Sequence, residues 1–332
     1  MGIGLALITV LGLIFFAYFG TAVVGLNALF AIVFPYAAFI IFVLGFIYRI
    51  VKWGKSPVPY RIPTTAGQHY SSLWFKQNKI DNPSTAWGVA LRMFFEVFTF
   101  RSLFRNTKAE LLQGRLYVGS SKWLWLGAIA FHYSFLVIFL RHMRFFTPET
   151  PWVIDTIESL DSFLQVHILG SPLLYITNLT ILAALLYLLG RRILDPKIKY
   201  ISLPSDYFPL FLILGIITTG ILMRYFFKVD VTAIKELTLG LVYFKPVVPK
   251  GIGSLFYIHL FLVSILFAYF PFSKLMHMGG VFLSPTRNLA NNNRMERHVN
   301  PWEYPVKHRH YEEYEDEFRE KMKKAGIPVE KE

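Results

Sequence analysis

The sequence contains no cysteine. This absence excludes disulfide bonds, thiolate-ligated zinc, cysteine-ligated iron–sulfur clusters, c-type haem attachment and a cysteine nucleophile. Charge is also scarce, because Asp, Glu, Lys and Arg make up 17% of the 332 residues, against about 25% in a typical soluble domain. Gly-rich phosphate loops, internal repeats and zinc-site spacings are missing from the sequence as well. Any redox chemistry of this chain must therefore use histidine ligands or a diffusible cofactor.

Hydrophobic residues, by contrast, make up 54% of the chain, and the mean hydropathy is +0.44. This surplus is too large for one globular core and must face lipid. Six apolar stretches are long enough to span about 30 Å of hydrocarbon; they cover approximately residues 3–24, 28–48, 123–146, 173–189, 208–227 and 255–272. The first lacks the basic segment and cleavage site of a signal peptide. The sequence therefore predicts an all-α fold, a polytopic membrane helix bundle of about six transmembrane helices.

The charges of the loops predict the orientation of this bundle. Residues 49–122 contain 12 basic and 3 acidic residues, and residues 191–206 contain 4 and 2, whereas the loop after the third span is acidic. The positive-inside rule places 49–122, 191–206 and both termini in the cytoplasm, in a multi-pass protein of the cytoplasmic membrane. Residues 228–250, with 4 basic and 2 acidic residues, must lie outside and fit this orientation poorly. The stronger charge asymmetry of the other loops decides the orientation. The net charge of +13 is thus mostly an orientation signal, and we expect no nucleic acid partner.

Four regions follow along the chain. Residues 1–50 hold two N-terminal transmembrane helices, 51–121 a basic cytoplasmic loop, 122–279 a four-helix domain, and 280–332 a charged cytoplasmic tail. Residues 85–104 in the loop form an amphipathic segment that suits either the membrane interface or packing against a partner. In the tail, residues 311–324 are a charged run that favours a short helix, docked on another protein or disordered.

Four of the nine histidines lie in or at the end of apolar spans. His132 and His142 lie in the third span, His259 lies in the sixth, and His277 follows at its end. Ionisable groups in membrane helices are costly and are functional candidates by default. A single such histidine would as often form a hydrogen bond between helices, but two helices with two each are a stronger signal. The other five are explained by polar or interfacial positions: His69, His167, His298, His308 and His310.

The predicted topology pairs these four histidines. The third span runs outward and the sixth runs inward, so His132 should face His277 near the cytoplasmic side, and His142 should face His259 near the outer side. At about 100° per residue, His259 and His277 fall on the same helix face, and His132 and His142 differ by about 80°. Ten residues rise about 15 Å and eighteen about 27 Å, so the rises do not match. Tilted helices, inclined ligand axes or a kink at Pro271 are each open explanations.

Haem fits this arrangement better than the other cofactors. Zinc would require carboxylates or thiolates beside the imidazoles, and a proton relay would require Asp or Glu within the predicted spans. A haem needs two facing histidines, an apolar pocket and cations near its propionates, and Arg141, Arg144 and Arg224 lie near the outer ends. Each arginine is equally explained by snorkelling to the interface. We expect two bis-histidine haems b; a transporter or channel with pore-lining histidines and a non-redox membrane scaffold remain the alternatives.

The spacing of the histidines resembles the di-haem cytochrome b, or gamma, subunit of respiratory nitrate reductase, over residues 120–280. That resemblance implies the pairs His132/His277 and His142/His259. Three tail segments, TRNLANN at 286–292, RHVNPW at 297–302 and YEEYEDEF at 311–318, resemble DsrM-type (HmeC-like) proteins. These are the cytochrome b subunits of the DsrMKJOP complex, or Hdr-like menaquinol oxidoreductase. The additional N-terminal span and the long basic loop depart from the nitrate reductase subunit but are expected in the DsrM branch.

This resemblance implies a function in dissimilatory sulfur metabolism, such as sulfate reduction. The chain would be the quinol-oxidising electron-transfer subunit of a membrane oxidoreductase, exchanging electrons with menaquinol or menaquinone and performing no thiol or disulfide catalysis itself. Its implied partners are a cytoplasmic iron–sulfur subunit resembling heterodisulfide reductase and further membrane and periplasmic subunits. By the same analogy, a quinone pocket lies near His142 and His259, with Arg144 as a quinone or propionate contact.

Overall fold

A computed structural model describes residues 2–56, 78–162, 174–291 and 308–331. Within these ranges, six helices are long and apolar enough to cross a membrane, which confirms the predicted all-α polytopic bundle. They are α1 (Gly2–Tyr18) continued by η1 (Phe19–Val23), η2 (Leu29–Val33) continued by α2 (Phe34–Gly54), α5 (Lys122–His142) continued by η4 (Met143–Phe145), α7 (Ile176–Leu194), α9 (Pro204–Tyr225), and α11 (Ser254–Tyr269) continued by η5 (Phe270–Phe272).

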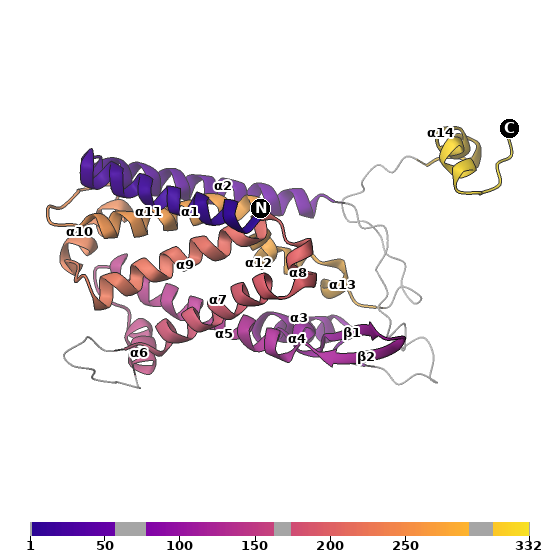
Figure 1. Ribbon diagram of the computed structural model, residues 1–332, viewed down its shortest axis with the longest axis horizontal. Coiled ribbons are helices and arrows are strands. Elements are labelled where there is room, and N and C mark those ends of the chain that lie inside the picture. The colour runs from indigo at the N-terminus through magenta and orange to yellow at the C-terminus, as the bar shows by residue number, and fades with distance from the viewer. Residues whose placement is uncertain (1, 57–77, 163–173, 292–307, 332) are drawn as a thin grey trace.

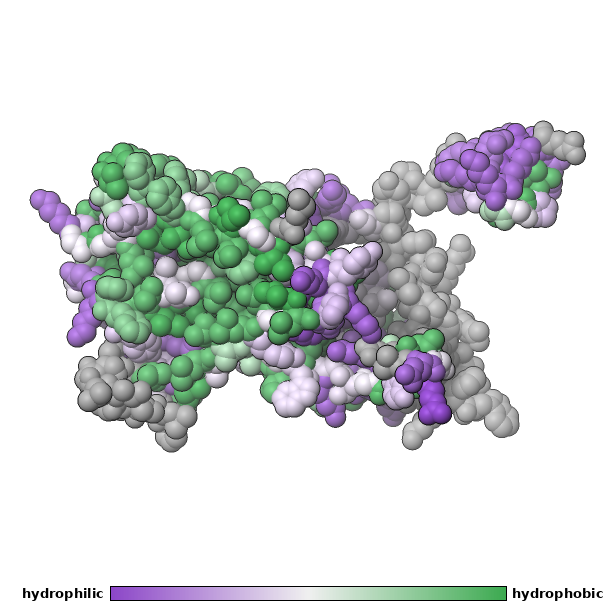
Figure 2. Space-filling view, viewed as in Figure 1, coloured by the Kyte–Doolittle hydropathy of each residue, from purple (hydrophilic) through white to green (hydrophobic). Residues whose placement is uncertain are grey.

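These helices are apolar on nearly every face, as lipid-spanning helices are. Their outward surfaces carry large hydrophobic side chains such as Ile8, Phe15 and Leu44. Figure 2 shows hydrophobic side chains covering the bundle and hydrophilic ones gathered at its two ends. An α-helix satisfies its backbone hydrogen bonds internally, so it is stable where water is absent. The chain is therefore a multi-pass membrane protein.

Packing within the bundle joins α5 to α7, α1 to α9, and α11 to both α2 and α9. Phe30, Leu212 and Leu262 are fully buried at its centre. Small residues allow helices to approach closely: a Cβ atom added at Gly127 of α5 would lie 2.6 Å from the ring of Tyr187 in α7. A glycine on α5 thus lets α7 approach closely, as small residues do between membrane helices.

The remaining elements divide between the two ends of the bundle (Figure 1). One end carries the N-terminus, the extramembrane hairpin, and several short helices; these are α3 (Ala86–Thr99), α4 (Arg101–Arg105), β1 (Thr107–Leu112), β2 (Arg115–Ser120), α8 (Pro196–Ile201), η6 (Lys274–Met276), α12 (His277–Gly280), η7 (Val281–Leu283) and α13 (Pro285–Asn288). The opposite end carries α6 (Trp152–Asp161) and α10 (Val231–Val242). Successive connections between the six spans therefore lie at alternate ends of the bundle. Which end faces the cytoplasm stays a prediction.

The β1–β2 hairpin was not predicted from the sequence. Its strands pair antiparallel from Thr107 opposite Ser120 to Leu112 opposite Arg115. Gln113 and Gly114 form the turn with φ of 50° and 74°, the two positive values that a type I′ hairpin turn requires. The Gln-Gly pair between two alternating segments was the available signal.

The amphipathic segment folds as α3 and α4, and one face of α3 packs on the tail of the same chain. Arg92 is buried and donates to the carbonyl oxygens of Arg287 and, at 3.0 Å, of Leu289. Glu96 forms an ion pair with Arg287 at 2.8 Å. The opposite face stays exposed and apolar; its residues are Trp87, Leu91, Phe94 and Phe98. The tail segment 286–291 therefore has an intramolecular partner.

The charged run in the tail forms the helix α14 (Tyr311–Lys324), as the sequence favoured. Buried Glu315 accepts hydrogen bonds from the backbone N–H groups of Glu330, at 2.8 Å, and Lys331, at 2.9 Å, so the end of the chain folds back on this helix. His308 and His310 are exposed, as expected. The predictions for His69, His167 and His298 lie outside the described residues.

Candidate functional site: two histidine pairs

The structure brings the four candidate histidines together as two pairs, one towards each end of the bundle. The ring centres of His142 and His259 are 6.5 Å apart and the rings are nearly parallel, with 15° between their planes. The ring centres of His132 and His277 are 6.0 Å apart and the planes are nearly perpendicular, at 82°. We call these the 142/259 pair and the 132/277 pair. Their role as ligands stays a prediction.

Three of the four imidazoles are oriented by backbone carbonyl groups. The Nδ1 atom lies 2.7 Å from the carbonyl oxygen of Ala128 for His132, 2.7 Å from that of Ile138 for His142, and 2.8 Å from that of Lys274 for His277. A carbonyl oxygen only accepts, so Nδ1 carries the proton in each ring. The lone pair of each neutral imidazole is therefore on Nε2, the atom that would bind a metal.

His259 is oriented by a hydroxyl group of the neighbouring helix. Its Nδ1 atom lies 2.9 Å from Oγ1 of Thr219 in α9, and that hydroxyl donates to the carbonyl oxygen of Gly215 at 2.8 Å. The hydroxyl oxygen is thus left to accept from Nδ1. Sequence reasoning missed Thr219, although two threonines and a glycine at 218–220 interrupt an otherwise apolar span.

The distances between the ring centres of both pairs match a metal ion held between two imidazoles. A metal–nitrogen bond of about 2 Å on each side, with the ring centre about 1 Å further, separates two ring centres by about 6 Å. Among the described residues, no group of three or more His, Asp or Glu could complete such a site. A metal ion held by two imidazoles would need its remaining ligands from a bound group, and a haem would supply four nitrogens. Phe100 and Phe131 lie edge-on to His132, at 5.1 and 5.3 Å, so aromatic side chains surround this imidazole.

The sixth span does not continue as one helix to His277, so the expectation of a shared helix face is wrong. The α11 helix ends at Tyr269, and Pro271 lies in the 3₁₀ turn that follows. Ser273 is then extended, with ψ of 177°, and its hydroxyl accepts from the N–H of Leu275. His277 begins the separate helix α12. Because the chain between the two histidines is not α-helical throughout, the rise of about 27 Å for eighteen helical residues does not apply.

A polar cluster lies beside the 142/259 pair. Arg141 and Asp161 form a buried ion pair, and Asp161 also accepts from the backbone N–H of Thr177 at 2.9 Å. The guanidinium groups of Arg141 and Arg224 lie over the ring of Tyr175, at 3.6 and 4.0 Å from its centre. Two of the three arginines noted in the sequence are thus held by partners within the chain.

Arg144 is also engaged within this cluster. Its Nη1 atom donates to both carboxylate oxygens of Glu158 at 2.8 Å, and the hydroxyl of Tyr175 donates to the same carboxylate. Burial alone would raise the pKa of Glu158, but the bonds from Tyr175 and Arg144 outweigh it and hold the pKa below its ordinary value. Burial and the bond to Glu158 raise the pKa of Tyr175. Whether Arg144 contacts a quinone or a propionate stays a prediction.

Comparison with known proteins identifies the family. Residues 89–297, more than half of the chain, match the nitrate reductase gamma subunit family. The matched stretch contains both histidine pairs. The chain belongs to the nitrate reductase gamma subunit family. This gamma-type chain is also 46% identical over 285 residues to the Hdr-like menaquinol oxidoreductase cytochrome b-like subunit of Archaeoglobus fulgidus, covering 84% of each chain.

A second relative has the same description. The Hdr-like menaquinol oxidoreductase cytochrome b-like subunit of Archaeoglobus profundus is 47% identical over 275 residues, which cover 81% of each chain. The N-terminal hairpin of α1 and α2 lies before the stretch that matches the gamma family. We call the matched stretch the gamma-type core; the hairpin lies outside it but packs on α9 and α11.

Proposed function

We propose that this gamma-type chain is a DsrM-like di-haem cytochrome b that carries electrons between menaquinol or menaquinone and a cytoplasmic iron–sulfur subunit, in dissimilatory sulfur metabolism. The observation that carries the proposal is the pair of imidazoles at each end of the bundle, each ring with its Nδ1 proton bonded and its Nε2 lone pair available. The names of the two relatives, cytochrome b-like subunits of a menaquinol oxidoreductase, support it.

A haem bound at each pair supplies reversible one-electron reduction. The residues of this chain fix where those two sites lie. His132 and His142 are both on α5, so the ten residues between them set an axial separation of about 15 Å between the sites. Their bonds to carbonyl groups of the preceding helical turn hold both rings at fixed angles to the helix. The helix α5 therefore provides one histidine to each site and fixes the distance between the two sites.

We propose that menaquinol is oxidised at the end of the bundle that holds the 142/259 pair, beside the polar cluster of Arg144, Glu158 and Tyr175. Oxidation of a hydroquinone releases two electrons and two protons, so the site needs a proton acceptor. The carboxylate of Glu158, held by Arg144 and Tyr175, is the proposed acceptor. Arg144 holds that carboxylate in place and is the proposed polar contact for the quinone headgroup.

The opposite end is the proposed exit towards the partner. The 132/277 pair lies at the end of the bundle that carries α3, α4 and the β1–β2 hairpin. These elements belong to the loop with the largest excess of basic residues. A chain without cysteine has no ligands for a Cys₄ cluster. Iron–sulfur clusters that accept the electrons must therefore belong to another subunit.

The decisive experiment is the dithionite-reduced minus oxidised spectrum of the purified chain, with a pyridine haemochrome count. We expect b-type absorbance and two haems per chain. His259→Ala should retain one haem, whereas His310→Ala, which changes an exposed histidine of the tail, should retain two. A colourless wild-type protein would contradict the proposal and favour a transporter, a channel or a scaffold.

The quinone contact needs a separate test. In Arg144→Ala, reduction of the haems by a menaquinol analogue should slow, while reduction by dithionite should reach the same extent as in the wild type. Normal rates with the menaquinol analogue would show that Arg144 is not the quinone contact, without affecting the haem assignment.

A further inference from the structure

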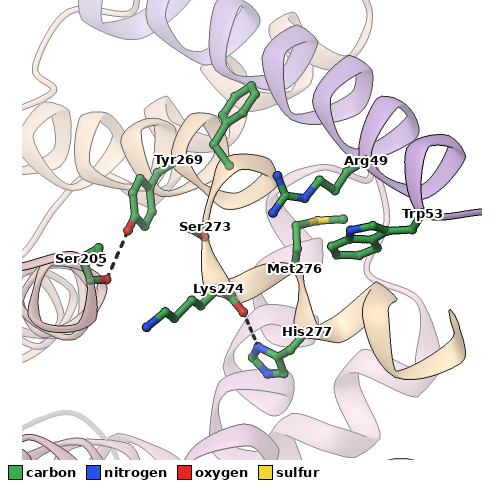
Figure 3. A pocket seen from close by; sticks show the side chains of 9 residues that line it. Arg49, Trp53, Ser205, Tyr269, Ser273, Lys274, Met276 and His277 are labelled. Carbon is green, nitrogen blue, oxygen red and sulfur yellow. Dashed lines mark hydrogen bonds between the residues drawn. The ribbon is translucent and has the colours of Figure 1, made fainter. Parts of the chain in front are cut away.

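A cavity of about 450 Å³ lies beside His277, at the end of the bundle opposite the proposed quinol site (Figure 3). Three parts of the chain line it: the last turns of α2 with Arg49 and Trp53, the start of α9 with Ser205, and the segment from Tyr269 to His277. The cavity therefore joins the N-terminal hairpin to the turn that holds His277.

Arg49 lines this cavity without an anionic partner in the part of the chain that the structure describes. Its Nε atom is buried and has no hydrogen-bond partner among the described residues, and its guanidinium lies 5.2 Å from the centre of the Trp53 ring. The other lining cation, Lys274, is already paired with Asp206 at 2.5 Å. The buried Nε atom holds one side of the guanidinium out of water, and the residue as a whole is partly buried. A partly buried guanidinium without an anion is unfavourable, so the cavity favours an anionic group.

Two close contacts fix Arg49 relative to His277. A Cβ atom at Gly45 would lie 2.7 Å from Cβ of Pro271, and one at Gly279 would lie 2.8 Å from Cδ1 of Ile50. These contacts hold α2 against the chain before His277 and again after it. Arg49 lies between the two contact points on α2, so packing fixes its position relative to the segment that carries His277.

We infer that Arg49 is the counter-charge for a carboxylate of the haem held by His132 and His277. The inference rests on the proposed function. A haem carries two carboxylates on one edge, and a carboxylate inside an apolar bundle requires a cation with which to pair. Arg49 is suited to this role because a guanidinium binds carboxylates through two parallel N–H groups. The N-terminal hairpin thereby supplies a residue to a site whose histidines belong to the gamma-type core.

This assignment has an electrostatic consequence. A fixed positive charge near the site favours the reduced state, which carries one positive charge fewer. Removal of the Arg49 charge should therefore lower the reduction potential of the haem at the 132/277 pair. The haem at the 142/259 pair, at the other end of the bundle, should keep its potential.

The test is a redox titration of Arg49→Gln in the His259→Ala background, where the 132/277 haem is the one that remains. We expect the equilibrium to shift about tenfold towards the oxidised haem, which is about 59 mV for one electron. Arg49→Lys should largely restore the potential. Lys52→Gln, an equal charge change on an exposed residue of the same helix, is the matched control and should leave it unchanged.

An unchanged potential in Arg49→Gln, with the haem still bound, would overturn this inference and leave the proposed function intact. Loss of a co-purified phospholipid from Arg49→Gln, measured as phosphorus, together with an unchanged potential would show that the cavity holds a lipid phosphate instead, and would also overturn it. A wild-type chain without haem would overturn the proposed function itself.

Discussion

The two histidine pairs are built in different ways. His142 and His259 lie on the long helices α5 and α11, are at least partly buried, and have nearly parallel rings. His277 begins a four-residue helix after a break, and it and His132 are exposed, with nearly perpendicular rings. The packing of long helices suffices for the 142/259 pair. The 132/277 pair depends in addition on a turn that another part of the chain holds in place.

The largest expected effect is the loss of one haem in His277→Ala or His259→Ala, and the surviving haem should differ between the two variants. Parallel imidazoles split the two iron d orbitals that interact with the rings, whereas perpendicular imidazoles leave them close in energy. Electron paramagnetic resonance should therefore show an ordinary rhombic low-spin ferric signal in His277→Ala and a highly anisotropic one in His259→Ala. Identical signals would contradict the ring angles described above.

Asp161→Asn should give the next largest effect, at the end of the 142/259 pair. The substitution leaves Arg141 as a buried charge without its carboxylate, which costs about 3–5 kcal/mol. We expect a lower thermal unfolding temperature of the detergent-solubilised protein. Asp155→Asn, an exposed carboxylate on the same helix α6, is the control. Equal unfolding temperatures for the two variants would show that the ion pair is not a determinant of stability.

Gly45→Ala tests the contact between α2 and Pro271 that holds the segment before His277, which we call the clamp on the 132/277 pair. Its new methyl group would lie 2.7 Å from Cβ of Pro271, and such overpacking costs about 1–3 kcal/mol. The potential or the resonance signal of the 132/277 haem should change, and that of the 142/259 haem should not. Gly12→Ala, where the structure has no atom within 4 Å of the added Cβ, should leave both haems unchanged. A change in the 142/259 haem alone would contradict the proposed clamp.

The smallest effect concerns the acid side of the stability profile. The pKa of Glu158 lies below its ordinary value of 4.5 in the folded chain, so its carboxylate stabilises the fold above that pH. This contribution, about 1 kcal/mol for a half-buried pair, is lost as the pH falls through the lowered pKa. Glu158→Gln should thus unfold at a lower temperature than the wild type at pH 7, and the difference should shrink below pH 4.5. A pH-independent difference would rule out this role of the ionised carboxylate.

The sequence predicted features that depend on long regular patterns. Six apolar runs located the spans, and the opposite directions of α5 and α11 predicted which histidines would face each other. Contacts between distant residues were missed. The hydroxyl of Thr219 reaches His259 because α9 packs beside α11. The break before His277 contacts Gly45, and Gly279 after it contacts Ile50. No local pattern encodes such contacts, because each depends on how two helices pack in the folded bundle.

The same contacts impose an order on biosynthesis. A chain is made from its N-terminus, so α2 exists before the segment from Pro271 to Gly279 leaves the ribosome. The last histidine to be synthesised, His277, therefore folds onto a helix that is already available. The first and last parts of the bundle must meet before the 132/277 pair is complete, whereas both histidines of the 142/259 pair lie before the break at Pro271. A chain that has not inserted its N-terminal hairpin would therefore lack the contacts of Gly45 and Ile50 that hold the segment around His277.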